Sequence, residues 1–411
     1  MKPPKRRMSI SRRSFLALSA AATASPVAQA VTASSDLPTT PTGTRSGLER
    51  LDALAQGAVS SRSTPGIALS AWKAGKQIHS CTVGMANLEC GSRVTDASIF
   101  RIGSVTKQFT AALILKLVSA GKLSLSDPAQ EHLPTLSTHE PFTVLELLNH
   151  TAGVRDGDYD TAGLRQHTQI EVAERIAGQK PFFDFRPGTA WLYSNANYIL
   201  IGAVVEQVTG MPLAEAAARL LFDPLGLEHT AFDTAADVVT GRVSGYTPTD
   251  VPNTPFQNAE YVDARLAGGA GAMRSTASDL CRWHHALFHE NILPDALTAT
   301  MTMPGKLRNG QLATTNRFSS ADSAMGDAQY GLGLFLDNAT RDESLIAGHH
   351  GGINGFASYL ASHPSSGLSY ACLCNADTHP GLPFRDIRRT VFSEILTAAT
   401  TGYGKVAITS H

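Results

Sequence analysis

The stretch RIGSVTKQFTAALILKLVSAGKL, residues 101–123, places a Ser-x-x-Lys pair at the start of a strongly apolar predicted helix. Gly103 precedes the pair and Gly121 ends the helix. Residues three apart share one helix face, so Ser104 and Lys107 point the same way. Free N–H groups at a helix N-terminus favour negative charge, and an acyl-transfer nucleophile needs this because its attack generates an oxyanion. This motif alone leaves a nucleophile and a plain N-cap equally open.

Two other pairs match the same pattern. Ser70–Lys73 lies in an alternating segment, and in a strand residues three apart point to opposite faces. Ser119–Lys122 lies at the carbonyl end of the helix, which disfavours a developing anion. Ser104–Lys107 is therefore the candidate for chemistry. Its Lys must be neutral to act as a base, which costs roughly 4–5 kcal/mol at pH 7 unless burial or a nearby cation lowers its pKa.

Strand patterns occur at both ends of the chain and helical patterns between them. Residues 66–89 read as a hairpin, and strand character returns at 330–337, 343–352, 356–364 and 368–376. The sequence predicts an α+β fold: an antiparallel sheet formed from both termini and flanked by helices, with an inserted mostly helical region.

We expect a single catalytic domain over residues 46–400. Its α/β part is expected at about 46–110 and 265–400, its helical part at about 111–264, and a tail at 401–411.

The first 30 residues carry six basic residues, no acid and an Ala-rich apolar run of about 15 residues, too short to span a bilayer. Arg12-Arg13 followed by Phe15-Leu16 resembles a twin-arginine export signal, and Ala28-Gln29-Ala30 a cleavage site. Residues 31–45 then form a polar linker. The pattern predicts a periplasmic or secreted protein with no membrane span after cleavage; a basic tail or membrane anchor is the alternative.

Removal of that segment leaves 28 basic against 35 acidic residues, a formal charge near −7. This argues against nucleic acid or an anionic membrane as the partner. The five cysteines are too few for a disulfide scaffold. Cys81 and Cys90 could bridge the hairpin, which spacing cannot decide, and Cys372 and Cys374 should share one strand face. We find no zinc-like Cys/His spacing and expect no metal.

Two further motifs follow Ser104–Lys107. Tyr193-Ser194-Asn195 lies between a Pro-Gly turn and a helical run; Tyr193 could relay a proton, with its pKa lowered beside Lys107, while Asn195 could bind a substrate carbonyl and fix Lys107. In AGHHGGINGF, residues 347–356, a strand enters Gly-rich backbone that a substrate could approach closely. Alone, the first of these motifs is more typical of a packed Tyr with a helix-capping Asn, and the second could be a hairpin turn with a surface His.

The ordered motifs S-x-x-K, Y-x-N and H-x-G resemble the serine β-lactamase-related family, which includes class C β-lactamases, DD-carboxypeptidases, D-aminopeptidases and related esterases. Flanking stretches such as FRIGSVTKQFTA, LLNHTAGV and AGGAGAMRSTASDL extend the resemblance over roughly residues 65–375.

The resemblance implies roles for individual residues. Ser104 is similar to the acylated nucleophile, and Lys107 and Tyr193 to the general-base pair. Asn195, His349 and Gly351 match substrate-binding positions, and the backbone N–H groups of Ser104 and Gly352 an oxyanion hole. For His150, in NHTAG, we expect a structural role in its loop.

The resemblance implies a serine hydrolase that forms an acyl-Ser104 intermediate on peptide, amide or ester substrates, without a cofactor, and the N-terminal segment predicts that it is exported. Class C β-lactamases usually carry Lys where this chain has His349, and a His is only partly charged near pH 7. D-Peptidase or esterase activity is therefore favoured over strong β-lactamase activity. The alternative is a penicillin-binding-type sensor that acylates or binds without turnover. The small-molecule or peptide substrate and the oligomeric state stay open.

Overall fold

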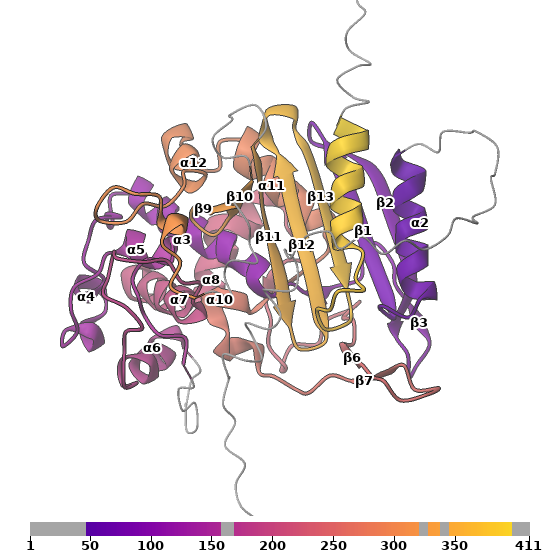
Figure 1. The fold of residues 1–411 in the computed structure, drawn as a ribbon, viewed down its shortest axis with the longest axis horizontal. Helices are drawn as coiled ribbons and strands as arrows, with labels where there is room; N and C mark the ends of the chain where they lie inside the picture. Colours follow the sequence, from indigo (N-terminus) through magenta and orange to yellow (C-terminus); the bar gives the residue numbers. More distant parts are fainter. Residues whose placement is uncertain (1–46, 158–167, 320–327, 338–344, 397–411) are drawn as a thin grey trace, which may run out of the picture.

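A computed structural model describes residues 47–157, 168–319, 328–337 and 345–396, so the predicted export segment lies outside the described residues. Its centre is an eight-stranded antiparallel sheet. The strands lie in the order β3 (Ser92–Arg93), β2 (Lys76–Asn87), β1 (Gly66–Lys73), β13 (Leu368–Cys374), β12 (Phe356–His363), β11 (Ile346–Ile353), β10 (Phe335–Asp337) and β9 (Gln329–Tyr330). Strands from the two ends of the chain meet at the β1–β13 pair (Figure 1). The predicted fold class is confirmed.

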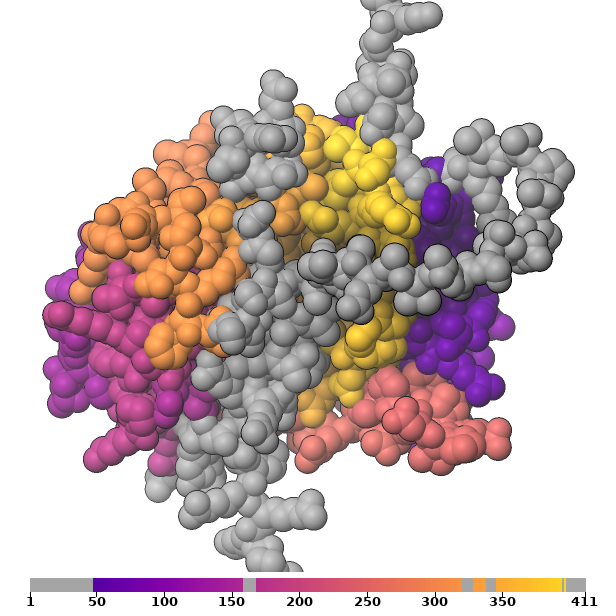
Figure 2. Space-filling view, viewed as in Figure 1, coloured from indigo at the N-terminus to yellow at the C-terminus, as the bar shows by residue number. Residues whose placement is uncertain are grey.

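Helices cover both faces of this sheet (Figure 1). On one face α2 (Gly47–Ser60) and α13 (Phe384–Arg389) pack on alternate residues of β1 and β13. The indigo α2 and the yellow C-terminal segment lie close together in the space-filling view (Figure 2). On the other face lies α11 (Ala277–His289), whose Trp283 stacks on Phe109 with ring centroids 4.4 Å apart.

The remaining helices form the layer that borders the β9 end of the sheet. They are α3 (Thr106–Ser119), α4 (Ala129–His132), α5 (Val144–Leu148), α6 (Gln169–Ala177), α7 (Asn195–Thr209), α8 (Leu213–Ala217), α9 (Asp223–Leu225), α10 (Gly268–Gly271) and α12 (Asp295–Met301). Two small sheets complete the fold: β4 (Phe100–Arg101), β8 (Met273–Ser275) and β5 (Ala231–Phe232), and the pair β6 (Tyr246–Pro248) and β7 (Phe256–Asn258).

Helices α3 and α7 are buried almost all round, which explains why their sequences lack a polar face. A 3₁₀ turn, η1 (Gly103–Val105), leads into α3. The predicted end of α3 is confirmed, since Gly121 follows it with a φ of +65°. Within the described ranges no single helix is long and apolar enough to cross a bilayer; α7 and the segment Leu213–Leu225, joined by a sharp bend, reach that length and apolarity only as a pair.

The hairpin predicted at residues 66–89 is confirmed as β1 and β2. Cys81 and Cys90 are free thiols, so no disulfide closes it. Cys372 and Cys374 share one face of β13, as expected, and are also free.

The sheet touches the helical layer most closely where β11 passes η1. A Cβ on Gly351 would lie 2.0 Å from the carbonyl oxygen of Ile102, and one on Gly103 would lie 2.6 Å from the amide nitrogen of Gly352. Gly103 also has a φ of +50°, a conformation that glycine adopts at little cost. Glycine at both positions therefore lets the two backbones come into direct contact.

We predict that Gly351→Ala lowers the free energy of unfolding by about 2–3 kcal/mol, because backbone atoms on both sides must move apart. Gly57→Ala is the matched control: it lies in α2, where no atom is within 4 Å of the new Cβ, and should raise stability by about 0.5–1 kcal/mol. Urea unfolding followed by circular dichroism measures both changes. Unchanged stability of the Gly351 variant would contradict the close contact.

Candidate active site

Ser104 and Lys107 are joined at the junction of η1 and α3. The Nζ of Lys107 lies 3.0 Å from the Oγ of Ser104. Ser104 is 8% exposed, whereas Lys107 is completely buried. The hydroxyl therefore reaches the surface of the site while the amine lies behind it. Of the three Ser-x-x-Lys pairs, this one has a buried amine beside its serine hydroxyl.

The Lys107 amine is also held from two other helices. It lies 2.8 Å from the Oδ1 of Asn195 at the start of α7 and 2.8 Å from the carbonyl oxygen of Ala270 in α10. Burial lowers the pKa of Lys107 well below its usual value, and the nearby Asp156 opposes this. A neutral amine has two N–H donors and one lone pair. It can donate to Asn195 and Ala270 and accept the proton of Ser104.

Tyr193 lies against the same amine, with its ring centroid 4.8 Å from the Nζ of Lys107. Burial raises the pKa of Tyr193, and the nearby Ser104 hydroxyl only partly opposes this. The expectation that Lys107 lowers the pKa of Tyr193 is therefore wrong. The cause is desolvation: a buried phenolate is costly, and a neutral Lys107 does not stabilise it.

Asn195 is fixed on both ends of its side-chain amide. Its Oδ1 faces Lys107, and its Nδ2 donates to the carboxylate of Asp156 at 3.0 Å. One N–H of that amide nitrogen remains for a substrate carbonyl, as the resemblance implied. Asp156 is 6% exposed and was not identified from the sequence. It lies in the loop after α5, a few residues beyond the NHTAG stretch.

His349 lies in β11 but both of its ring nitrogens are already engaged. Its Nδ1 donates to the carbonyl oxygen of His350, and its Nε2 lies 3.2 Å from the hydroxyl of Tyr330. A carbonyl only accepts, so Nε2 is the acceptor and Tyr330 the donor. Burial lowers the pKa of His349 well below its usual value, with help from the charges of His350 and Lys107. The ring is therefore neutral near pH 7 and lines the site beside Tyr193, 6.0 Å away between centroids.

Gly351 and Gly352 bring the backbone of β11 against η1. A Cβ on Gly103 would touch the amide nitrogen of Gly352, so this N–H group lies next to the residue that precedes Ser104. The Oγ of Ser358 in β12 donates to the carbonyl oxygen of Ile102 at 2.7 Å and ties the turn to the sheet. The structure thus brings together every candidate residue that the sequence proposed.

His150 packs against Tyr193 and accepts hydrogen bonds from the start of α7. It is fully buried with a φ of +65°, and its ring centroid lies 4.6 Å from that of Tyr193. The backbone N–H of Ser194 and the Nδ2 of Asn197 donate to its Nδ1. These contacts agree with the structural role expected for this loop residue.

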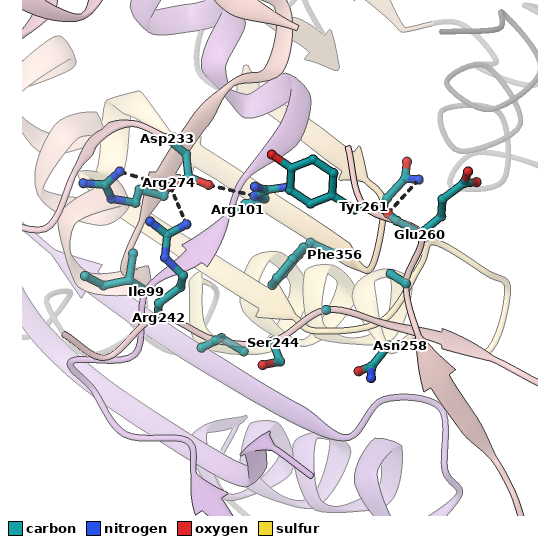
Figure 3. A pocket seen from close by; sticks show the side chains of 14 residues that line it. Ile99, Arg101, Asp233, Arg242, Ser244, Asn258, Glu260, Tyr261, Arg274 and Phe356 are labelled. Carbon is teal, nitrogen blue, oxygen red and sulfur yellow. Dashed lines mark hydrogen bonds and ion pairs between the residues drawn. The ribbon is translucent and has the colours of Figure 1, made fainter. Parts of the chain in front are cut away.

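An arginine cluster that was not identified from the sequence lines the pocket shown in Figure 3. Arg101 of β4 and Arg274 of β8 are direct cross-strand partners, and both guanidinium groups bind the carboxylate of Asp233, as does Arg242. Asp233 has no exposed side-chain surface and offsets the repulsion between the paired arginines. The ion pairs hold β4, which leads to Ser104, beside β8, which follows the Ala270 carbonyl. The four side chains of this cluster line a cavity of about 290 Å³.

Among the described residues there is no group of three or more His, Cys, Asp or Glu side chains that could hold a metal ion.

A model of the family described as Beta-lactamase matches residues 51–392. Penicillin-binding protein 4 of Amycolatopsis lactamdurans is 29% identical over 363 residues, which cover 84% of this chain and 89% of that protein. Esterase EstB of Burkholderia gladioli is 34% identical over 205 residues, covering 45% of this chain and about half, 52%, of the esterase. The crystal structure of a D-stereospecific amidohydrolase from Streptomyces sp. is similar with a TM-score of 0.66 and 26% identity, covering 84% of this chain and 98% of that one.

We predict that Lys107 makes stability depend on pH. The unfolded chain binds this proton up to the ordinary pKa, 10.5, whereas the folded chain, with its lowered pKa, does not. Stability therefore rises with pH through this window, by about 1.4 kcal/mol per unit. Lys107→Met should reduce the slope between about pH 7.5 and 9.5 by that amount.

Equilibrium urea unfolding at several pH values measures the slope, and Lys76→Met, at an exposed position, should leave it as in the wild type. Equal slopes for the Lys107 variant and the wild type would show that the folded protein keeps Lys107 charged.

Proposed function

The chain belongs to the Beta-lactamase family, and on that basis we propose that it hydrolyses esters and amides through an acyl-Ser104 intermediate. Its relatives include an esterase, an amidohydrolase and penicillin-binding proteins, so the chain is a serine hydrolase of the β-lactamase type. The observation that carries the proposal is the buried amine of Lys107 beside the hydroxyl of Ser104.

In the proposed acylation step the Oγ of Ser104 forms a bond to the substrate carbonyl carbon while its proton passes to the lone pair of Lys107. The carbonyl oxygen becomes an oxyanion, which accepts from the backbone N–H groups of Ser104 and Gly352. The second N–H of the Asn195 amide is free to bind a carbonyl elsewhere in the substrate. Because these donors belong to rigid backbone and buried side chains, little reorganisation accompanies the reaction.

In the collapse of the intermediate the carbon–leaving-group bond breaks, and the leaving group needs a proton. Tyr193 stays a phenol because burial raises its pKa, so it can donate that proton and regain one from protonated Lys107. In deacylation the same groups act in reverse on water, which adds its oxygen to the acyl carbon and returns a proton to Ser104.

The third motif, His349-His350-Gly351, supports a preference for substrates that are recognised without a carboxylate group. His349 is buried, neutral and engaged on both ring nitrogens, so it offers no permanent cation to a substrate anion. We therefore propose acyl groups that carry no carboxylate, in esters or in amides including D-aminoacyl amides, in preference to β-lactams. The names of the esterase and of the D-stereospecific amidohydrolase support this substrate class.

We also propose export by the twin-arginine route, on the sequence of residues 1–30. Replacement of Arg12 and Arg13 by Lys should leave the protein in the cytoplasmic fraction of an expressing bacterium, while the unchanged chain reaches the periplasm. Equal periplasmic amounts of both proteins would contradict this route.

We predict that a fluorophosphonate probe labels Ser104 and that Ser104→Ala lowers kcat/KM for a p-nitrophenyl acyl ester by at least about 10³-fold. Mass mapping identifies the labelled residue. A panel with a D-aminoacyl amide and a chromogenic cephalosporin should give the lowest kcat/KM for the cephalosporin. Full activity of the alanine variant would overturn the proposed nucleophile.

The same panel tests the alternative of a sensor. One equivalent of product per chain followed by no turnover, on every substrate, would support a penicillin-binding-type sensor, whereas steady turnover supports a hydrolase.

We predict that Tyr193→Phe lowers kcat by about 10²-fold or more with little change in stability. The Tyr193 hydroxyl is buried without a hydrogen bond of ordinary geometry among the described residues, so its loss removes little binding energy. Tyr370→Phe is the matched control, because its hydroxyl is also buried and unsatisfied there but lies on the opposite face of the sheet. Steady-state kinetics and thermal melting measure both variants. Wild-type kcat in the Tyr193 variant would contradict its proton-transfer role.

A further inference from the structure

Asp156 is a buried carboxylate that the mechanism above does not use. Its loop is anchored by neighbouring contacts: Arg155 forms an ion pair with Asp184 at 2.7 Å, and the Arg155 backbone N–H donates to the carbonyl of Phe182. The side chain reaches the N-terminus of α7, where it accepts from the Nδ2 of Asn195 and, at 3.2 Å, from the backbone N–H of Ala196. These contacts hold the Asp156 carboxylate against the amide of Asn195.

The contacts of Asn195 fix which way its amide faces. The carboxylate of Asp156 only accepts hydrogen bonds, so it must meet the Nδ2 side of the amide. That leaves Oδ1 toward Lys107, where it accepts from the amine at 2.8 Å. With the amide turned over, a donor would face the amine and an acceptor the carboxylate. By fixing the orientation of the Asn195 amide, Asp156 thus determines that the Oδ1 atom, and not the Nδ2 atom, faces the amine of Lys107.

Asp156 also replaces a missing helix cap. Ser194 occupies the N-cap position of α7 but its side chain makes no capping hydrogen bond. Asp156 supplies the acceptor for the first turn and lies at the positive end of the helix dipole. Burial raises the pKa of Asp156, and the N–H groups of Asn195 and Ala196, together with Lys107 when it is protonated, partly oppose this.

We propose that Asp156 is a positioning residue for the reaction: it orients Asn195 toward Lys107 and places a carboxylate charge behind the amine that takes the proton of Ser104. The inference rests on the proposed function, in which Lys107 is the base. It assigns to Asp156 a role in catalysis beyond that of a helix cap.

The other titratable groups around Lys107 do not supply this charge. Tyr193 and Tyr198 face the amine with pKa values raised by burial, so both are neutral phenols. His150 and His349 are neutral imidazoles, since burial and the charge of Lys107 lower their pKa values. Among the groups around the amine, Asp156 is the carboxylate whose charge favours the protonated form of Lys107.

The test is the pH dependence of kcat/KM for an activated ester. The rate rises with pH as Lys107 loses its proton. Asp156→Asn removes the charge that favours the protonated amine, so the acid limb should move to lower pH by about one unit. The new amide has one acceptor oxygen for the two donors of Asn195 and Ala196, so one of these contacts is lost and the pH-independent kcat should fall by about 10-fold or more. Asp156→Ser, also uncharged, should shift the limb in the same direction if the Asn variant folds poorly.

Two controls separate this role from a structural one. Asp156→Glu keeps the charge and should leave the acid limb within a few tenths of a unit of the wild type, although kcat falls. Asp279→Asn removes a carboxylate in the first turn of α11 that accepts from the N–H of His229 and has no hydrogen bond to a residue of the site among the described contacts; it should lower the melting temperature without moving the limb.

Different results would contradict the proposed function and the proposed role of Asp156. Ser104→Ala is assayed in the same series, and an unchanged rate would remove the proposed function itself. If Ser104→Ala is inactive but both uncharged Asp156 variants keep the wild-type acid limb and lose only stability, Asp156 is a helix cap and the inference is wrong. The rate of fluorophosphonate labelling of Ser104 against pH should show the same shift as kcat/KM, because it follows acylation alone.

Discussion

The burial of one lysine amine is the constraint on which the rest of this structure depends. An amine in that position is tolerated because it is neutral and because Ser104, Asn195 and the Ala270 carbonyl satisfy it. These three partners come from η1, α7 and α10, so the amine joins three segments far apart in the sequence. The burial of α3 and α7 on nearly all sides keeps water from the amine. The apolar character of α3 is therefore a requirement of the chemistry as well as of the core.

The second constraint is the contact between the sheet and η1. Strands from both chain ends form the sheet, and its inner strand β11 comes against the turn that carries Ser104. Glycines 103 and 351 permit that contact, and the Ser358 hydroxyl ties the turn to β12. On the other side the ion pairs of Asp233 join β4 to β8. The nucleophile is thus held between two rigid sheets rather than on a free loop.

The sequence predicted what depends on local geometry and motif order. Ser104 and Lys107 could be found because they lie one helical turn apart, and Tyr193 and His349 because their flanking residues resemble one family. Asp156 could not, since its contact with Asn195 spans 39 positions and exists only in the folded loop. Tyr330 likewise reveals its role only once it lies against His349. The predicted pKa direction of Tyr193 was wrong because sequence shows which groups are neighbours but not how completely they lose water.

The charges around Lys107 explain why a His at position 349, where class C β-lactamases usually carry Lys, suits this site. When Lys107 takes the proton of Ser104, a cation appears in a buried region where His349 is neutral and Asp156 is the nearby carboxylate. A permanent cation at 349 would repel it, in the same way that a protonated Lys107 lowers the pKa of His349. A neutral His avoids this repulsion but gives up a contact to a substrate carboxylate. This charge balance supports our proposal of acyl groups that do not need an anion recognised beside the scissile bond.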